Sequence, residues 1–219
     1  MSVSKPPVKQ SLVSAAASKD RRVELLSAAA DVFVQKGFHE AKVSDVVAAA
    51  GVAQGTFYLY FKNKTDVLQQ LIGGCCQDIV LRITPDSAVE TEIKTSEGLR
   101  EQNLAFLIDV FKLLETEHQA AQLILGSMAG ADPIVDKTLS DFRAALVRII
   151  KECLEEGIAG GYVRRLDPEI IAEGIVGMIY HIAFERFVRK RRLGTTIEQL
   201  AEEIIDFEMN GIAARTKGK

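Results

Sequence analysis

Apolar side chains recur every three or four residues along almost the whole chain, the spacing that places them on one face of an α-helix. The sequence lacks runs of alternating apolar and polar residues bounded by turn-forming pairs, the pattern that strands of a half-exposed sheet give. It therefore predicts an all-α fold of about nine helices.

Glycine, proline and capping residues mark where these helices should begin and end. Asp167 followed by Pro168 predicts one helix start, and Thr196 in the run TIEQ has the order of a capping box at another. The expected helices cover residues 19–36, two short segments within 42–61, and residues 64–83, 97–117, 118–129, 133–159, 167–191 and 196–214.

Residues 42–64 (KVSDVVAAAGVAQGTFYLYFKNK) predict two short helices around a tight turn. Ser44 has a side chain that can accept a backbone N–H at the start of the first helix. Gly51 follows the last apolar position, where a glycine can close a helix in the left-handed conformation and Val52 can fold back. The second helix is expected to begin at Gln54.

The second helix should have an apolar face and a polar edge. Phe57, Leu59 and Phe61 are expected to pack in the core. The polar edge consists of Gln54, Thr56, Tyr58 and Tyr60. A helix, a turn containing glycine and a second helix with exposed hydrogen-bonding groups is the arrangement that places a recognition helix in the DNA major groove. The pattern predicts a helix-turn-helix over about residues 42–61.

Two longer motifs resemble one family. The run TFYLYFKNKTDVL closely resembles the signature of the TetR (tetracycline-repressor-like) family of transcriptional regulators, and the upstream ELLSAAADVFVQKGFHEAKVSDVVAAAGV resembles that family's first helix and the approach to its helix-turn-helix. The rest of the chain resembles the family only in helical character and length. The N-terminal run SLVSAAA is short and weakly apolar for a signal peptide, so residues 1–18 are expected to form a flexible arm. The resemblance implies a DNA-binding domain at 19–79, and an effector-binding and dimerisation domain at 80–219.

The resemblance places seven residues at DNA, and these are Ser44, Gln54, Gly55, Thr56, Tyr58, Tyr60 and Lys64. Residues 54–56 would lie nearest the base edges, since glutamine can pair with adenine and threonine can reach a thymine methyl. The tyrosyl hydroxyls and Lys64 suit phosphate oxygens, which position the protein without reading sequence. Gly55 would allow close backbone approach. Lys62 joins the set because burying its ammonium would cost free energy.

Charge is distributed unevenly in a way that favours DNA binding. The chain carries a net charge of −3 with a pI near 5.7. Residues 1–64, however, contain nine Lys and Arg against five Asp and Glu, a balance of +4, which leaves −7 for the remainder. The basic excess therefore coincides with the helix-turn-helix.

The middle helices are the expected effector site. The resemblance implies that they enclose a pocket whose ligand moves the helix at 64–83 and releases DNA. Candidate lining residues are Phe106, Phe111, Leu114, Gln122, Ile124, Met128, Phe142 and Tyr180. Such a lining would favour an apolar or aromatic small molecule with a few polar groups. Ordinary core packing is the alternative for most of these side chains.

The resemblance also implies that the last two helices of two subunits form a four-helix bundle. Expected interface residues are Ile171, Gly174, Ile175, Gly177, Met178, Ile182, Leu200, Ile204 and Phe207. The glycines would let a second helix approach closely. A two-fold homodimer would present paired recognition helices to a palindromic operator. The alternative is that these apolar faces pack inside a single chain, and some of their residues are expected to do so.

Other features carry weaker chemistry. Glu115 and His118 have the Glu-x-x-His spacing of carboxylate-bridged metal sites, but the further ligands such sites need are missing, so no metal is expected. Cys75 and Cys76 could sense redox state, although inert buried thiols are the more common case. The five basic residues within 186–192 suit a solvated helix end better than a second nucleic-acid patch.

Composition and motifs narrow the class of protein. The 219 residues are 47% hydrophobic and 26% charged, as in ordinary globular proteins. The longest apolar run, residues 174–184, is shorter than the ~20 residues of a membrane span. Three cysteines without a secretory signal suit a reducing cytoplasm. No phosphate loop or catalytic motif is present, so neither an enzyme nor a cofactor is expected.

The sequence therefore predicts a ligand-responsive DNA-binding regulator, a repressor that binds a palindromic operator as a dimer and is released by a small-molecule effector. The alternative is a helical ligand-binding or assembly protein that has lost operator recognition. Tyr58, Tyr60 and Lys64 favour the regulator, because a protein that no longer binds DNA would not need these three DNA-contacting side chains.

Overall fold

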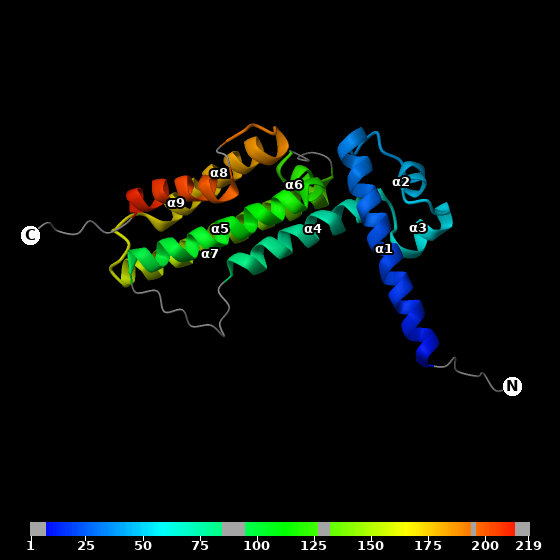
Figure 1. Ribbon diagram of the computed structural model, residues 1–219, viewed down its shortest axis with the longest axis horizontal. Coiled ribbons are helices and arrows are strands. Elements are labelled where there is room, and N and C mark those ends of the chain that lie inside the picture. The colour runs from blue at the N-terminus through cyan, green and yellow to red at the C-terminus, as the bar shows by residue number, and fades with distance from the viewer. Residues whose placement is uncertain (1–7, 85–94, 127–131, 194–195, 213–219) are drawn as a thin grey trace, which may run out of the picture. The chain divides into compact units, whose positions relative to one another are not determined.

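The computed structural model describes residues 8–84, 95–126, 132–193 and 196–212, and this part of the chain is helical without any strand (Figure 1). The predicted all-α class is confirmed. The helices are α1 (Val8–Lys36), α2 (Val43–Ala49), α3 (Gln54–Tyr60), α4 (Lys64–Ile83), α5 (Ser96–Thr116), α6 (His118–Leu125), α7 (Pro133–Ala159), α8 (Pro168–Ala183), a π-helical turn η1 (Phe184–Val188) and α9 (Ile197–Ile212).

The chain divides into two compact units, Met1–Leu71 and Ile72–Lys219, and the division falls within α4. In the first unit α1 packs against α2, and α2 against α3. In the second, α7 packs against α8 and α5 against α9. The domain boundaries expected after residues 18 and 79 stay a prediction.

The first helix is longer than expected, because α1 begins at Val8 rather than at Lys19. Residues 8–18 contain neither glycine nor proline and include three consecutive alanines, the strongest helix formers. Nothing in their sequence stops a helix, so the expected helix start at residue 19 was wrong, and the arm expected over residues 1–18 stays a prediction.

Fully buried aromatic and aliphatic side chains hold the first unit together. Phe33 of α1, Val46 of α2, and Phe57 and Phe61 at α3 are almost inaccessible to solvent. Leu59, expected in this core, is 79% exposed instead. Because Phe57 and Phe61 are four residues apart on one face, the position midway between them turns to the opposite side of the helix.

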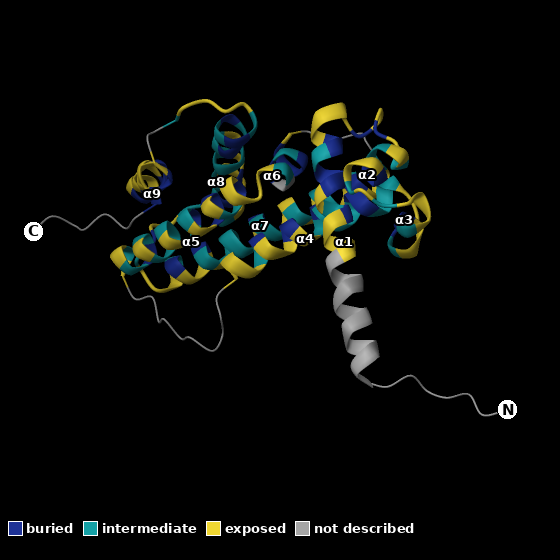
Figure 2. Ribbon diagram, turned by 45° about the vertical axis from the view of Figure 1, so that its right-hand side comes forward, coloured by how far each residue is buried: buried dark blue, intermediate teal, exposed yellow. Residues whose placement is uncertain are grey.

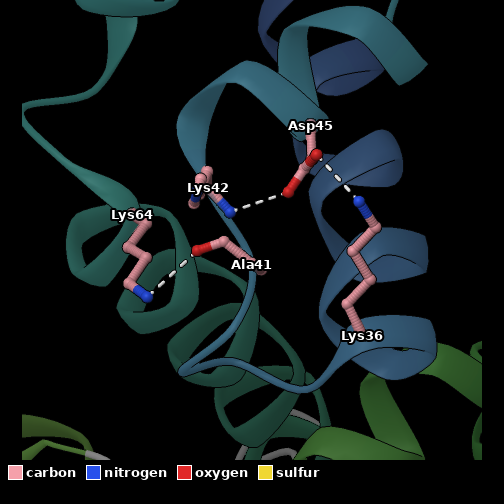
Figure 3. A network of polar contacts seen from close by, with 5 residues as sticks. All are labelled: Lys36, Ala41, Lys42, Asp45 and Lys64. Carbon is pink, nitrogen blue, oxygen red and sulfur yellow. Dashed lines mark hydrogen bonds and ion pairs between the residues drawn. The ribbon is translucent and has the colours of Figure 1, made fainter.

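The start of α2 also differs from the prediction. The helix begins at Val43, and the backbone N–H of Lys42 donates to the Asp45 carboxylate at 3.0 Å. Lys36 donates to the other oxygen of Asp45 at 2.8 Å (Figure 3). These two hydrogen bonds, the one from Lys36 first, lower the pKa of Asp45. Ser44 is exposed in the first turn and is not the capping residue.

The turn between α2 and α3 forms as predicted. Gly51 has a φ of +65°, its N–H donates to the carbonyl of Ala48 at 3.3 Å, and the N–H of Val52 donates to that of Val47 at 3.0 Å. This pair of bonds is the Schellman arrangement that satisfies the last carbonyls of a helix. It sets the angle at which the chain enters α3.

Lys64 has a structural role that the sequence did not predict. Its ammonium donates to the carbonyls of Phe38, His39 and Ala41 at 2.8, 2.9 and 3.0 Å and lies 4.7 Å from the centre of the Phe38 ring. Figure 3 shows the bond to Ala41 beside the Asp45 contacts. An ammonium has three donors. All three are used within the unit, and the contact of Lys64 with a phosphate stays a prediction.

Several helix ends in the second unit confirm the capping pattern. Asp167 accepts the N–H groups of Glu169 and Ile170 ahead of α8, and Thr196 accepts the N–H of Gln199 ahead of α9. Helix α8 ends at Ala183 rather than near residue 191, because the chain there widens into the π-helical turn. In that turn the buried carboxylate of Glu185 pairs with Arg189 and Arg191 at 3.2 and 3.1 Å. Part of the basic run at 186–192 is therefore structural.

Replacing Gly51 with alanine should destabilise the first unit by about 1–2 kcal/mol, the cost of a left-handed backbone with a Cβ. A Cβ built at Gly51 meets no other atom within 4 Å, so the loss comes from the backbone alone. The matched control is Gly55→Ala, where the space is equally open and φ is not positive. It should be neutral or stabilising by up to about 1 kcal/mol in urea unfolding. Equal effects of the two changes would contradict the assignment.

Replacing Lys64 with methionine should lower the free energy of unfolding by about 1–3 kcal/mol, because three carbonyls lose a charged donor. Lys62→Met, at an exposed side chain two residues away, should change it by less than about 0.5 kcal/mol. Urea unfolding measures both variants. Hydrogen exchange of residues 38–41 should accelerate in Lys64→Met only, and unchanged exchange there would show that Lys64 does not hold this loop.

Candidate DNA-binding and effector sites

Helix α3 presents the predicted polar edge to solvent. Gln54, Gly55 and Tyr58 are exposed, Thr56 and Tyr60 are half-buried, and Figure 2 shows exposed and half-buried positions alternating with buried ones around α2 and α3. The edge begins at the first residue of α3, where backbone N–H groups lack helical partners. These groups have the chemistry to meet base edges and phosphates.

Neighbouring aromatic rings orient the tyrosines of this edge. The ring of Tyr58 packs edge-on against that of Phe57, with centroids 5.3 Å apart, and Tyr60 contacts Phe61 at 6.4 Å. Both partners are core residues. Each tyrosine is therefore held on its apolar side while Tyr58 stays 54% exposed. Leu59, beside them, is exposed on the same short helix, although the sequence predicted it in the core.

The basic groups around the helix-turn-helix divide into paired and exposed ones. Lys36 is paired with Asp45, and Lys64 is bound to three carbonyls. Lys42 and Lys62 have exposed side chains, as does Ser44 on α2. Among the predicted contacts, the lysine with an exposed side chain is Lys62, whereas the ammonium of Lys64 is bonded within the unit.

An apolar cavity of about 180 Å³ lies within the second unit. Six of the eight candidate residues line it, and they are Phe106, Phe111, Leu114, Ile124, Phe142 and Tyr180. Gln122 is half-buried and does not line the cavity, and Met128 lies outside the described residues. The cavity therefore gathers the predicted aromatic and aliphatic side chains from α5 to α8.

The cavity is long and reaches more helices than the sequence indicated. Its wall follows α5 from Leu99 to Leu114, a distance of about 22 Å at 1.5 Å per residue. Helix α4 contributes Ile79 and Ile83, and α9 contributes Ile205 and its neighbours on the same face. An elongated apolar molecule fits this lining better than a compact polar one.

Few polar groups face the cavity. The hydroxyl of Tyr180 donates to the carbonyls of Ile124 and Leu125 at 3.0 and 3.3 Å, so its proton is already used. Burial raises the pKa of this hydroxyl. The amides of Gln102 and Asn103 also line the wall.

One carboxyl in the lining was missed by the sequence analysis. Glu208 of α9 is 7% exposed, its Oε1 has no hydrogen-bond partner in the described part of the chain, and burial raises its pKa to about 7. The sequence held a signal, because Glu208 stands four residues after Ile204 and four before Ile212 on the apolar face of a helix.

The predicted dimer residues divide between surface and core. Gly174, Gly177 and Phe207 are exposed, with Phe207 71% accessible, whereas Ile171, Met178 and Ile182 are half-buried. Leu200 and Ile204 are buried within their own chain, and Ile175 lines the cavity. Helix α9 turns the face of Leu200 and Ile204 inward where it packs against α5, and the interface role of all three residues stays a prediction. Ile170 of α8, which is not among the predicted interface residues, is 68% exposed.

The cysteines lie in surroundings that suppress thiol reactivity. Burial raises the pKa of Cys75 and of Cys76 to about 12, and it also raises the pKa of Cys153. The thiolate is the reactive form, and at neutral pH it is almost absent at Cys75 and Cys76. Redox sensing by this pair is not supported.

The described residues contain neither a cluster of metal ligands nor a membrane-spanning helix. Within them, no group of three or more His, Cys, Asp or Glu side chains could hold a metal ion. Glu115, considered above as a ligand, lies 3.7 Å from Arg186. No helix in the same residues is long and apolar enough to cross a membrane.

Comparison with known proteins agrees with this geometry. The family model for bacterial regulatory proteins of the tetR family matches residues 25–71. The uncharacterized HTH-type transcriptional regulator YdgC of Bacillus subtilis (strain 168) is 32% identical over 164 residues, which cover 74% of this chain and 79% of YdgC. The fatty acid metabolism regulator protein of the same organism is 27% identical over 162 residues, covering 74% and 80% of the two chains.

A solved structure shares the fold. The transcriptional regulator FadR from Bacillus subtilis, in complex with stearoyl-CoA, superposes with a TM-score of 0.71 at 24% identity and covers 87% of this chain and 98% of its own. The match of the helix-turn-helix to the family model and the extended similarity to YdgC confirm the resemblance seen in the sequence. The chain belongs to the TetR family, whose members are DNA-binding transcriptional regulators and not enzymes.

Proposed function

We propose that this chain binds a palindromic operator as a homodimer, represses transcription there, and is released when an elongated apolar small molecule fills the cavity of its second unit. One observation carries the proposal: a single helix, α4, links the two sites. Its first residue, Lys64, is hydrogen-bonded to the loop before the helix-turn-helix, and Ile79 and Ile83 in its last turn line the cavity. A ligand that displaces these isoleucines acts on the helix that anchors the DNA-binding unit.

The coupling requires the ligand to distinguish two states. A ligand shifts the equilibrium only by the difference between its affinities for the DNA-competent and the DNA-incompetent form. Ile79 is buried and Ile83 half-buried against the cavity, so their positions depend on what fills it. We expect the filled cavity to favour the form whose recognition helices are wrongly spaced for the operator.

Exposed apolar and small residues on α8 and α9 support the dimer. Ile170, Gly174 and Gly177 share one face of α8 by their spacing, and Phe207 of α9 is 71% exposed. A large exposed apolar residue gains free energy when a second chain covers it. A two-fold dimer would bring two copies of α3 to two half-sites of a palindrome.

Relatives support the apolar character of the effector. The FadR structure contains stearoyl-CoA, and a SmeT–triclosan complex superposes on this chain with a TM-score of 0.70 at 20% identity. Proteins of this fold thus accommodate a long acyl compound and a small apolar compound. The length of the present cavity favours the first shape.

Loss of operator recognition, with the chain kept as a helical binding or assembly protein, is the alternative. It leaves unexplained why Gln54 and Tyr58 stay exposed at the start and middle of α3, and why Lys62 follows them. A mobility-shift assay with the DNA that flanks the chain's own gene separates the two. Specific retardation in the presence of competitor DNA supports the regulator, and its absence even at low salt supports the alternative.

The roles assigned to α3 and the residues after it can be separated by substitution. Gln54→Ala should reduce the preference for operator over competitor DNA by about 1–3 kcal/mol with little change in salt dependence. Lys62→Ala should weaken binding to all DNA and lower the slope of log affinity against log salt by about one. Lys137→Ala, at an exposed lysine of α7, controls for the lost charge. Identical behaviour of the first two variants would refute the division of roles.

A further inference from the structure

The cavity contains one residue with a formally charged side chain. Among the described residues that line it, Glu208 is the only Asp, Glu, Lys, Arg or His, and the other lining side chains are aliphatic, aromatic or neutral polar. Its carboxyl is 93% buried, and Oε1 lacks a hydrogen-bond partner within the described chain. Folded proteins rarely leave a buried polar atom unpaired, and such an atom calls for a functional reason.

The nearby charged groups have partners elsewhere. On the α5 and α9 surface, Arg100 pairs with Asp206 at 2.7 Å and Lys112 with Glu198 at 2.9 Å. Arg164 donates to the carbonyl of Gly211 at 2.5 Å. None of these bonds reaches Glu208. Its carboxyl therefore faces the cavity without a cation from the neighbouring elements in the described chain.

The other titratable and polar groups of the lining do not supply a positive charge, and the guanidinium of Arg143, which is not among the lining residues, lies over the Tyr180 ring, 5.5 Å from its centre. Cys153 of α7 is a neutral thiol, because burial raises its pKa. The hydroxyl of Tyr180 in α8 donates hydrogen bonds to the carbonyls of Ile124 and Leu125 in α6. Gln102 and Asn103 of α5 offer amide oxygens as acceptors and amide N–H groups as donors.

We propose that the effector is an elongated apolar molecule that ends in a protonated amine, with its ammonium bound to Glu208 and its apolar part lying along α5 toward Leu114. This proposal rests on the function proposed above, since it takes the cavity to be the effector site. The lining supplies the matching parts: an unpaired carboxyl oxygen, and about 17 Å of apolar wall along α5 between Asn103 and Leu114.

Charge distinguishes an amine from other head groups. A carboxylate or phosphate would be repelled by the ionised form of Glu208, and no cation among the described lining residues offsets that repulsion. A hydroxyl could pair with Oε1 but would leave the carboxyl uncompensated whenever it ionises. An ammonium both donates to the carboxyl and neutralises it, and hydrogen bonds between charged groups are about twice as strong as neutral ones.

Binding of an amine should also release a proton. Burial holds the pKa of Glu208 at about 7, so at pH 7 the carboxyl is protonated in a large fraction of molecules. A bound ammonium stabilises the ionised form, and the carboxyl proton passes to the buffer. The ligand keeps its own proton, so one charge pair forms.

Isothermal titration calorimetry with n-decylamine, 1-decanol and decanoate tests the proposal on the full chain. The wild type should bind decylamine most tightly, and Glu208→Gln, which keeps size and hydrogen bonding, should weaken decylamine binding about ten- to a hundredfold. Binding of decanol should change by less than about threefold in the same variant. Glu203→Gln, an exposed position on the same helix, is the matched control and should leave all three affinities unchanged.

A second readout needs no variant. At pH 7 the heat of decylamine binding to the wild type should depend on the ionisation enthalpy of the buffer, and this dependence should vanish in Glu208→Gln. The proposal is overturned if decylamine does not bind, if its affinity is the same in Glu208→Gln, or if decanol or decanoate binds the wild type as tightly. Failure of the operator assay above would instead count against the regulator function, because calorimetry requires no DNA.

Discussion

The ammonium of Lys64 donates hydrogen bonds to three backbone carbonyls between α1 and α2, and this contact joins the start of α4 to the loop that leads into the helix-turn-helix. Short helices such as α2 and α3 have little stability of their own in water. They depend on the buried face that Phe57 and Phe61 share with α1, and on a loop of fixed length and direction. Because the Lys64 side chain fixes the conformation of that loop, the position of the DNA-binding helices depends on the first residue of α4.

The two units differ in whether their key charged side chains have hydrogen-bond partners. In the first, the ammonium of Lys64 and the carboxylate of Asp45 are fully engaged, and both hold structure. In the second, Tyr180 and Glu185 are likewise bonded, yet Glu208 keeps an unpaired oxygen beside an apolar space. A buried unpaired acid lowers stability, and its position in the cavity lining is consistent with a group retained for binding.

The sequence predicted most of the fold because local rules decide it. The Gly51 turn, the Asp167 cap and the limits of α7 follow from residues within a few positions of one another. The same holds for the polar edge of α3. Leu59 was misplaced because a helix only seven residues long cannot bury three alternating positions on one face, so the periodicity of two phenylalanines excluded the residue between them.

Several site residues depend on contacts between residues distant in sequence. The partners of Lys64 lie more than twenty residues earlier and are backbone atoms, so no side-chain pattern could reveal them. Leu200 and Ile204 have the apolar spacing of an interface and of a core alike, and only the packing of α9 against α5 distinguishes the two. Glu208 differs from these residues, because the sequence alone shows an acidic residue at a position of α9 where the helical spacing calls for an apolar one. Glu208, which interrupts the apolar face of α9, is therefore a missed cavity residue that the sequence could have located.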